Sequence, residues 1–156
     1  MVGPHAMKKL KVILICGLLV SACVSMRGMR LKPVRPARGQ TPVEYTLQTT
    51  GYCSCGACCG WKRDWLGQTV FSHGPLKNKR KRVGYTASGT RALPGTVAAD
   101  TRIFPMGTIM YIPGYGYGHV EDRGGSIKGH HIDLYFRRHA QAKKWGRQTK
   151  RVKVWH

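Results

Sequence analysis

A chain of 156 residues has room for one domain with appendages rather than for several domains. It contains 27 lysines and arginines but only six aspartates and glutamates, which gives a formal net charge of +21. This imbalance favours anionic partners, such as nucleic acid, acidic lipid headgroups or acidic wall polymers, and argues against cationic ones. A merely well-solvated surface is the alternative, and charge alone does not exclude it.

The first segment, residues 1–22, has the features of an export signal. Three lysines precede the apolar run Val12–Val20, which is too short to cross a bilayer as a helix, and small residues then lead to Cys23. Val20–Cys23 also resembles a bacterial lipobox, and this resemblance implies cleavage before Cys23 and lipid on its sulfur. A plain secretory signal or a buried apolar helix is the alternative.

Export determines where the protein would act and what it would meet. We expect an exported, membrane-anchored lipoprotein of the bacterial cell envelope, a monomer with no nucleic-acid partner. Residues 23–42 contain three prolines and little apolar periodicity, which predicts a flexible tether after the lipidated Cys23. The folded domain is expected at residues 43–156.

This domain is predicted to be mainly β. Short runs rich in Val, Ile, Tyr, Thr and Phe are bounded by glycine and proline, and only Arg138–Trp145 has a helical pattern, which ends before Gly146. A small closed barrel with one short helix fits best, because closure removes exposed strand edges. The predicted strands are Glu44–Tyr52, Gly84–Ala87, Thr96–Ala99, Thr108–Ile112, His119–Glu121, His131–Phe136 and Arg151–Trp155.

Four of the six cysteines lie together as Cys53, Cys55, Cys58 and Cys59. In an exported protein paired disulfides are the first expectation, although the vicinal pair would be strained. Four thiols could instead bind zinc or a similar metal, but a tetrahedral site normally draws its ligands from two separated segments. A free redox pair is a third alternative. The sequence therefore favours disulfides, and predicts no metal ion or other cofactor.

Three of the six acidic residues lie in one short stretch, Val120–Phe136. Within it, Asp133 lies in an apolar run, where a charge is costly unless it is paired or used, and strand alternation places Asp133 and Tyr135 on one face. If that face lines a cleft, burial and repulsion from Asp122 and Asp100 would raise the pKa of Asp133, as a general acid requires. The alternative is an aspartate that caps a turn or pairs with arginine, and for Asp122 this alternative is equally good.

Several short motifs follow one another in a recognisable order. They are Thr86–Gly89, Val97–Asp100, Phe104–Thr108, Ile112–Gly116, Val120–Gly129, Ile132–Phe136 and Trp145–Gly146. Together they resemble the three-aspartate (3D) domain, a relative of the catalytic barrel of membrane-bound lytic transglycosylase A, over Tyr52 to Trp155. This resemblance implies a six-stranded double-psi β-barrel and an enzyme that cleaves peptidoglycan glycan strands.

The resemblance places the family's aspartates on Asp100, Asp122 and Asp133, with Asp133 as the catalytic one. Ordinary glycosidases use two carboxylates, whereas a lytic transglycosylase needs no water, because the muramyl C6 hydroxyl attacks its own C1. Asp133 would protonate the departing oxygen of the MurNAc–GlcNAc bond and then take the C6 proton. Asp122 and Asp100 would tune its pKa and hold sugar hydroxyls.

Five further residues are candidates for substrate binding. Thr86, Ser88 and Lys128 would donate hydrogen bonds, and Tyr115 and Tyr117 would stack on a sugar ring, unless their glycine-rich loop is simply a turn that packs on the barrel. Three other functions remain open: a non-catalytic wall-binding module, a basic lipoprotein that tethers wall to membrane by charge, and a hydrolase with two acids.

Overall fold

The computed structural model describes residues 34–156. The signal peptide, Cys23 and the first part of the tether, expected at residues 1–33, lie outside the described residues. No helix in the part that is described is long and apolar enough to cross a membrane.

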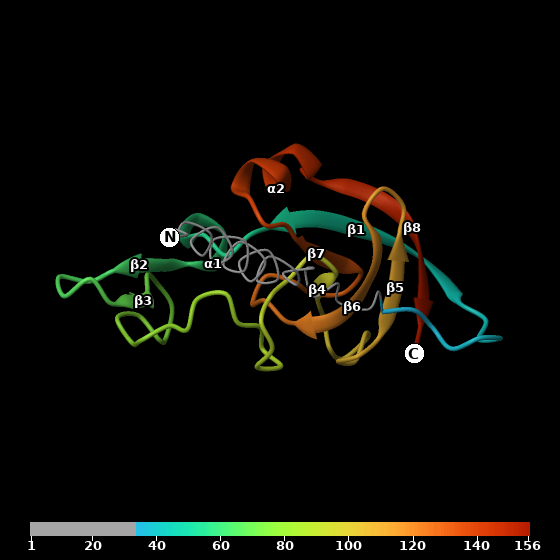
Figure 1. Cartoon of the computed structure of the whole chain (residues 1–156), viewed down its shortest axis with the longest axis horizontal. Helices are drawn as coiled ribbons and strands as arrows, with labels where there is room; N and C mark the ends of the chain where they lie inside the picture. The colour runs from blue at the N-terminus through green and yellow to red at the C-terminus, as the bar shows by residue number, and fades with distance from the viewer. Residues whose placement is uncertain (1–33) are drawn as a thin grey trace, which may run out of the picture. The chain divides into compact units, whose positions relative to one another are not determined.

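Six strands close into a barrel in the order β1-β7-β4-β6-β5-β8, with β8 paired back to β1 (Figure 1). Their bounds are β1 Val43–Tyr52, β4 Thr96–Ala99, β5 Ile109–Ile112, β6 Gly116–Asp122, β7 His131–Tyr135 and β8 Gln148–Trp155. Two of the pairs are parallel, β1 with β7 and β4 with β6, so their connections cross the barrel instead of forming hairpins. The predicted mainly β, six-stranded double-psi barrel is confirmed.

Side chains that fill the barrel interior alternate with outward-facing ones along β7 and β8, whereas all four residues of β4 are buried. On β8, Val152 and Val154 are fully buried while Lys153 between them is exposed. On β7, Ile132 and Leu134 point into the core, as predicted for Leu134. Asp133 and Tyr135 therefore face outward from the barrel core, on the face where the candidate site lies.

Helix α2 (His139–Trp145) lies against β1, and Gly51 makes this close approach possible. A Cβ on Gly51 would meet the backbone oxygen of Ala142 at 2.8 Å. The helix ends where the sequence predicts, because Gly146 follows with a φ of 63°, a backbone conformation that favours glycine.

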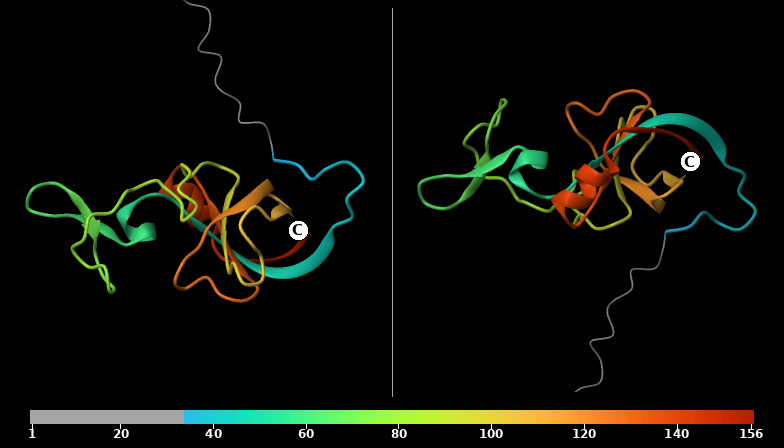
Figure 2. Two further views of the ribbon diagram at one scale, coloured as in Figure 1. Left: turned by 90° about the horizontal axis from the view of Figure 1, so that it is seen from below. Right: turned by 90° about the horizontal axis from the view of Figure 1, so that it is seen from above.

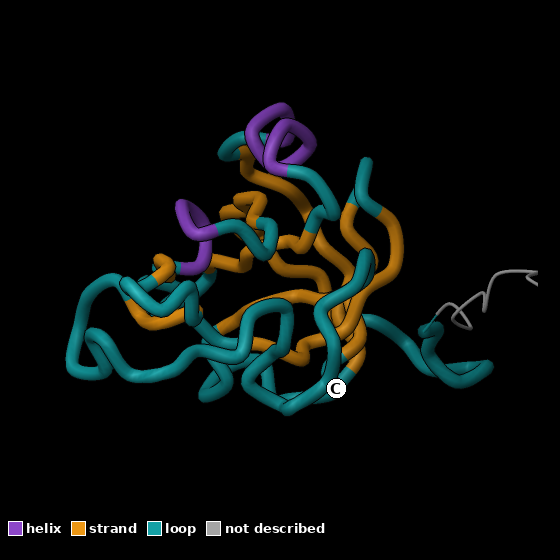
Figure 3. The backbone as a smooth tube through the Cα atoms, turned by 60° about the vertical axis from the view of Figure 1, so that its left-hand side comes forward, coloured by secondary structure: helices purple, strands orange, loops and turns teal. Residues whose placement is uncertain are grey.

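Three elements outside the barrel differ from the sequence-based expectation. Helix α1 (Gly56–Cys59) is a single turn inside the cysteine cluster, and β2 (Trp61–Arg63) and β3 (Thr69–Phe71) form a separate two-stranded arm. Figure 2 shows this arm extending to one side of the barrel, and Figure 3 shows α1 at its base. Conversely, the strand expected at Gly84–Ala87 is a loop, because the backbone of Ala87 is bound by Asp122 instead of by a strand.

Candidate active-site groove

The pairing of three barrel strands brings Asp122 and Asp133 to one place. β4 lies between β6 and β7, and its residue Ala98 pairs with Asp122 on one side and with Asp133 on the other. Asp122 and Asp133 thus flank the small residue Ala98 on the two neighbouring strands, and adjacent strands are about 4.8 Å apart. Two of the three aspartates predicted to act together do lie together.

An irregularity in the β4–β6 pairing selects which acidic residue takes this position. The register shifts after Val97, so that Val97 pairs with Val120 but Ala98 pairs with Asp122 instead of Glu121. A β-bulge of this kind re-aims a side chain. Glu121 instead accepts hydrogen bonds from two threonine hydroxyls.

Asp133 is partly removed from water. Thr50 on β1 donates a hydrogen bond to its Oδ1 at 2.9 Å, and the same Thr50 oxygen lies 2.9 Å from Nε2 of His131. Burial is the largest influence on the pKa of Asp133 and raises it, and the charge of Asp122 adds to this, whereas Thr50 and His131 act in the opposite direction. The net result is a raised pKa, so the carboxyl holds its proton more readily than an exposed aspartate.

Asp122 is held by three hydrogen-bond donors. Its Oδ1 accepts the backbone N–H groups of Ala87 and Arg123, each at 2.9 Å, and its Oδ2 accepts the hydroxyl of Tyr52 at 3.1 Å. Burial raises the pKa of Tyr52 far above its ordinary value, and Asp122 raises it further. Tyr52 therefore stays protonated and remains a donor to Asp122.

Both carboxyls line a groove of about 530 Å³, a size suited to a small ligand or a segment of a polymer. One wall is the outer face of the barrel, with Tyr52, Ala98 and Tyr135, and a second is the loop formed by residues 123–127. The third wall comes from the β2–β3 arm and the segment that follows it.

Three basic side chains also line the groove, namely Lys81, Arg82 and Arg123. Lys81 Nζ donates to the backbone oxygen of Cys59 at 2.6 Å, which fixes the arm to the cysteine turn. The Arg82 guanidinium lies 3.4 Å from the centre of the Tyr85 ring. The groove thus contains two acids and three basic side chains, and the positive charge of the basic ones attracts an anionic ligand.

Asp100 lies apart from the other two aspartates and does not line the groove. It is buried, and Arg102 binds both of its carboxylate oxygens, at 3.0 and 2.8 Å. The backbone N–H of Gly129 donates to it at 3.0 Å. The hydrogen bond from Arg102, followed by that from Gly129, holds the pKa of Asp100 well below its usual range. Asp100 is therefore an aspartate that pairs with arginine, the alternative given above, and it connects two loops.

Residues 95–156 match the family model of the 3D domain. This part of the chain thus resembles the 3D domain. The match contains all three aspartates and confirms the resemblance over these residues, while the cysteine turn, the β2–β3 arm and the Thr86–Gly89 motif precede it. YabE of Bacillus subtilis, named for cell wall shaping, is 33% identical over 75 residues, which cover 46% of this chain and 18% of YabE. YocH of the same organism, a cell wall-binding protein, is 40% identical over 58 residues, 37% of this chain and 20% of YocH.

Solved structures of the lytic transglycosylase MltA from Escherichia coli are also similar to this chain. One has 27% identity and a TM-score of 0.39, covering 45% of this chain and 26% of that one. Another, with bound chitohexaose, has 25% identity and a TM-score of 0.41, covering 51% of this chain and 29% of that one. The chain thus spans about a fifth of its curated relatives and under a third of MltA.

Thr86 and Ser88 precede the part that matches the 3D domain, and they are not part of the groove lining. Their hydroxyls lie 2.9 Å apart and share a network with Thr90. The backbone of Ser88 also donates to the backbone oxygen of Glu121 at 3.0 Å. Together with Ala87, these residues hold the loop that donates to Asp122, so they position that carboxylate.

The two tyrosines expected to stack on sugar lie outside the groove lining and contact other residues of the barrel. The Tyr115 hydroxyl accepts the N–H of Gly95 at 2.9 Å and donates to the backbone oxygen of Tyr135 at 2.8 Å, and burial raises its pKa to about 12. Tyr117 packs on Tyr111, with ring centres 5.0 Å apart. These contacts agree with the alternative in which the loop is a turn that packs on the barrel, and stacking on sugar stays a prediction. Lys128 is exposed and outside the groove lining.

The four clustered cysteines are free thiols in the structure, where the sequence favoured disulfides. Cys58 and Cys59 lie in the single turn of α1, and both line the groove. Cys53 is buried at the end of β1, with its Sγ atom 3.8 Å from that of Cys58. This separation is well beyond a disulfide length of about 2.05 Å.

Sequence reasoning missed Thr50 and Tyr52, which contact the two groove aspartates. Both lie on β1, where residues two apart face the same way, and they pair with Asp133 and Tyr135 of β7. Alternation along Glu44–Tyr52 could have placed them on one face. The pairing of that face with Asp133 could not be read from the sequence, because the two strands are about 80 residues apart and parallel.

Proposed function

We propose that this protein is an exported cell-wall enzyme that cleaves the MurNAc–GlcNAc bond of peptidoglycan by transglycosylation. The observation that carries the proposal is the position of Asp133, a carboxyl with a raised pKa in a groove bordered by basic side chains. The 3D domain and the cell-wall relatives support the same substrate class.

In the proposed reaction Asp133 acts first as an acid. Its proton passes to the glycosidic oxygen as the bond from that oxygen to the muramyl C1 breaks. The C6 hydroxyl of the same sugar then attacks C1, and its proton returns to Asp133. An internal anhydro ring forms, no water is consumed, and the carboxyl ends the cycle in its starting state.

Asp122 has a different role in this scheme. All three of its neighbours donate hydrogen bonds to it, so it is fixed as an acceptor beside the groove. A negative charge there would stabilise the positive charge that develops on the sugar ring as the bond breaks. Tyr52 links this carboxylate to the barrel wall next to Asp133.

The organisation of the chain belongs to the same proposal. Residues 1–22 would be a signal peptide, Cys23 the lipid-bearing first residue of the mature protein, and residues 23–42 a tether that lets the domain at 43–156 reach the wall. The arginine and lysine side chains of the groove would bind anionic groups of the glycan strand or of its peptide stems.

A wall-binding module without catalysis is the second candidate, favoured by the name of YocH. The two candidates differ in whether Asp133 carries out chemistry. A binding module needs the groove and its basic side chains, but it gains nothing from a carboxyl that keeps its proton.

The test is the release of soluble anhydromuropeptides from purified peptidoglycan, followed by mass spectrometry. Asp133→Asn should stay folded and bind wall material but lose about 10²- to 10⁴-fold in rate, because an amide cannot give and retake the proton. Glu44→Gln is the matched control, since Glu44 pairs with Arg151 at the surface away from the groove. Wild-type release by folded Asp133→Asn would remove Asp133 as the acid, and no release by the wild type would favour the binding module.

A further inference from the structure

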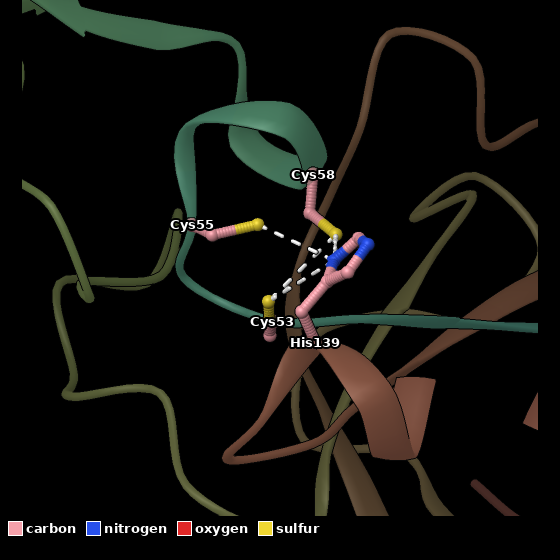
Figure 4. A group of neighbouring side chains, drawn as sticks. All are labelled: Cys53, Cys55, Cys58 and His139. Carbon is pink, nitrogen blue, oxygen red and sulfur yellow. Dashed lines mark hydrogen bonds between the residues drawn. The ribbon is translucent and has the colours of Figure 1, made fainter. Parts of the chain in front are cut away.

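Three thiols and one imidazole converge beside the groove, where Figure 4 shows the sulfur atoms of Cys53, Cys55 and Cys58 directed toward the ring of His139. One ligand atom from each of these four residues lies within 4.8 Å of every other. Cys53 is buried, whereas His139 is exposed, so the cluster is closed toward the barrel and open toward solvent.

The strand pairing explains why His139 meets the cysteines. β1 and β7 are parallel, and Tyr52 at the end of β1 pairs with Tyr135 at the end of β7. The two chain segments therefore leave the barrel side by side. One becomes the cysteine turn, and the other leads into α2, whose first residue is His139. The separated second segment that a metal site normally needs is thus present.

Four of the six distances among the ligand atoms are close to the edges of a tetrahedral metal site, and the other two are within 4.8 Å. With zinc–sulfur bonds of about 2.3 Å and zinc–nitrogen bonds of about 2.0–2.1 Å, a tetrahedron has edges of about 3.8 Å between sulfurs and about 3.6 Å between sulfur and nitrogen. The Sγ atoms of Cys53 and Cys58 are 3.8 Å apart. His139 Nδ1 lies 3.4 Å from the sulfur of Cys58, 3.5 Å from that of Cys55 and 3.9 Å from that of Cys53.

The fourth clustered cysteine does not belong to this set. The thiol of Cys59 donates to the backbone oxygen of Cys53 at 3.1 Å, and Cys59 packs with Tyr52, Ala98 and Tyr135 on the groove side. Its neighbour Cys58 also packs against these residues, but its sulfur lies 3.4 Å from Nδ1 of His139. Adjacent residues on the turn thus have different partners, which makes Cys59 a matched control for Cys58.

We propose that Cys53, Cys55, Cys58 and Nδ1 of His139 bind one zinc ion. Binding converts three thiols to thiolates, and their protons pass to the solvent buffer. Four protein ligands complete the tetrahedron and leave no open position, so the ion has a structural role and takes no part in the chemistry of the groove. Three thiolates and one imidazole select zinc over magnesium or calcium, which bind oxygen ligands.

The proposed ion ties α1 to α2 and thereby sets one wall of the groove. α1 continues through Gly60 into the β2–β3 arm, and Cys58, Cys59 and Gly60 all line the groove. Apart from the ion, hydrogen bonds such as that between the hydroxyls of Ser54 and Tyr135, 3.1 Å apart, connect this turn to the barrel, and Trp61 of the arm donates to the backbone oxygen of Ser54 at 2.9 Å. Removing it would loosen the wall opposite Asp122 and Asp133.

The test begins with the full chain, produced in zinc-supplemented medium, dialysed against a metal-free buffer and analysed for zinc by mass spectrometry. We expect about one zinc per chain, and X-ray absorption of the wild-type protein should show three sulfur ligands and one nitrogen ligand. After replacement by cobalt(II), the visible spectrum should have the strong bands of a tetrahedral thiolate site.

Variants then assign the ligands. Cys58→Ser and His139→Ala should lose the bound zinc, whereas Cys59→Ser should keep it. An unreduced chain that is lighter by the hydrogens of two disulfides and carries no zinc would overturn the proposal, and so would full zinc retention by Cys58→Ser. If a variant fails to fold, the X-ray absorption spectrum of the wild type identifies the ligand atoms instead. None of these measurements depends on lytic activity, so the zinc proposal and the proposed function fail separately.

Discussion

Replacing Tyr52 with phenylalanine removes one hydroxyl and leaves the ring in place. The ring packs edge-on against Tyr135, with centres 5.4 Å apart, and the substitution keeps this contact. What is lost is the hydrogen bond to Asp122 Oδ2 at 3.1 Å. This bond is longer than the 2.5–2.7 Å or so that is typical of a hydroxyl on a carboxylate, and Asp122 keeps two backbone donors. We therefore expect the lower end of the range for hydrogen bonds to charged groups, about 1.5 kcal/mol of unfolding free energy.

The pH dependence of this difference follows from the raised pKa of Tyr52. Its hydroxyl stays protonated in the folded protein, whereas in the unfolded chain it ionises near its ordinary pKa of about 10. The stability that Tyr52 contributes is thus fully present below pH 10 or so. It is lost as the pH rises further, because the unfolded state gives up a proton that the folded state keeps. The difference in unfolding free energy between the wild type and Tyr52→Phe should therefore become smaller above about pH 10.

Urea denaturation of the wild type and Tyr52→Phe, at neutral pH and above pH 10, measures both effects. The dependence of free energy on urea should be unchanged, since no additional surface is exposed. Tyr111→Phe is the matched control, because Tyr111 is 38% exposed on β5, and we expect a change within about 0.5 kcal/mol. Equal stability of Tyr52→Phe and wild type at neutral pH would refute the assigned hydrogen bond. If the same bond also positions Asp122 for catalysis, the rate of glycan cleavage should fall about tenfold.

Three further changes separate structural from functional residues. Gly51→Ala should lower the unfolding free energy by about 1–3 kcal/mol, because the new Cβ would strike a backbone oxygen of α2. Gly125→Ala should leave it unchanged, because a Cβ at Gly125 has no atom within 4 Å. Thermal unfolding measures both variants. Asp100→Asn should reduce stability in urea near neutral pH but not the rate of glycan cleavage per folded molecule. The difference in stability between the wild type and this variant should shrink as the pH falls below about 4, because the lowered pKa of Asp100 contributes stability only where its carboxyl is ionised. Arg123→Gln should weaken binding to purified wall in a salt-dependent way in pull-down assays, while Lys128→Gln, outside the groove, should not.

Patterns of neighbouring residues in the sequence were sufficient to predict much of the fold. The alternation in His131–Phe136 correctly predicted that Leu134 faces the core and that Asp133 shares a face with Tyr135, because the side-chain period of a strand is fixed. The end of α2 at Trp145 was also predicted, since Gly146 adopts a positive φ that few other residues tolerate. Both features depend on neighbours in sequence, which a single sequence displays.

The site was less predictable, because it depends on register and on distant pairing. The shift after Val97 determines that Asp122 and not Glu121 faces the groove, and no residue type signals it. Asp100 carried a local signal of its structural role, because its carboxylate accepts the backbone N–H of Arg102 two residues later and also binds the guanidinium of that residue. Pairing with arginine was the alternative given above for an aspartate, whereas Asp100 was expected to act with Asp122 and Asp133. His139 was missed as a partner of the cysteines, since it is more than 80 residues away from them in sequence.

One parallel strand pair accounts for both proposed sites. The pairing of β1 with β7 places Thr50 beside Asp133 and Tyr52 beside Tyr135, which builds the barrel wall of the groove. Where the same two strands end, their continuations carry the cysteine turn and His139, which form the cluster beside that wall. A parallel pair sends both chains out at one end, whereas an antiparallel pair would send them to opposite ends. The cluster can therefore stabilise the groove without contributing a residue to the proton transfer, and loss of the ion should loosen the groove while Asp133 stays in its strand.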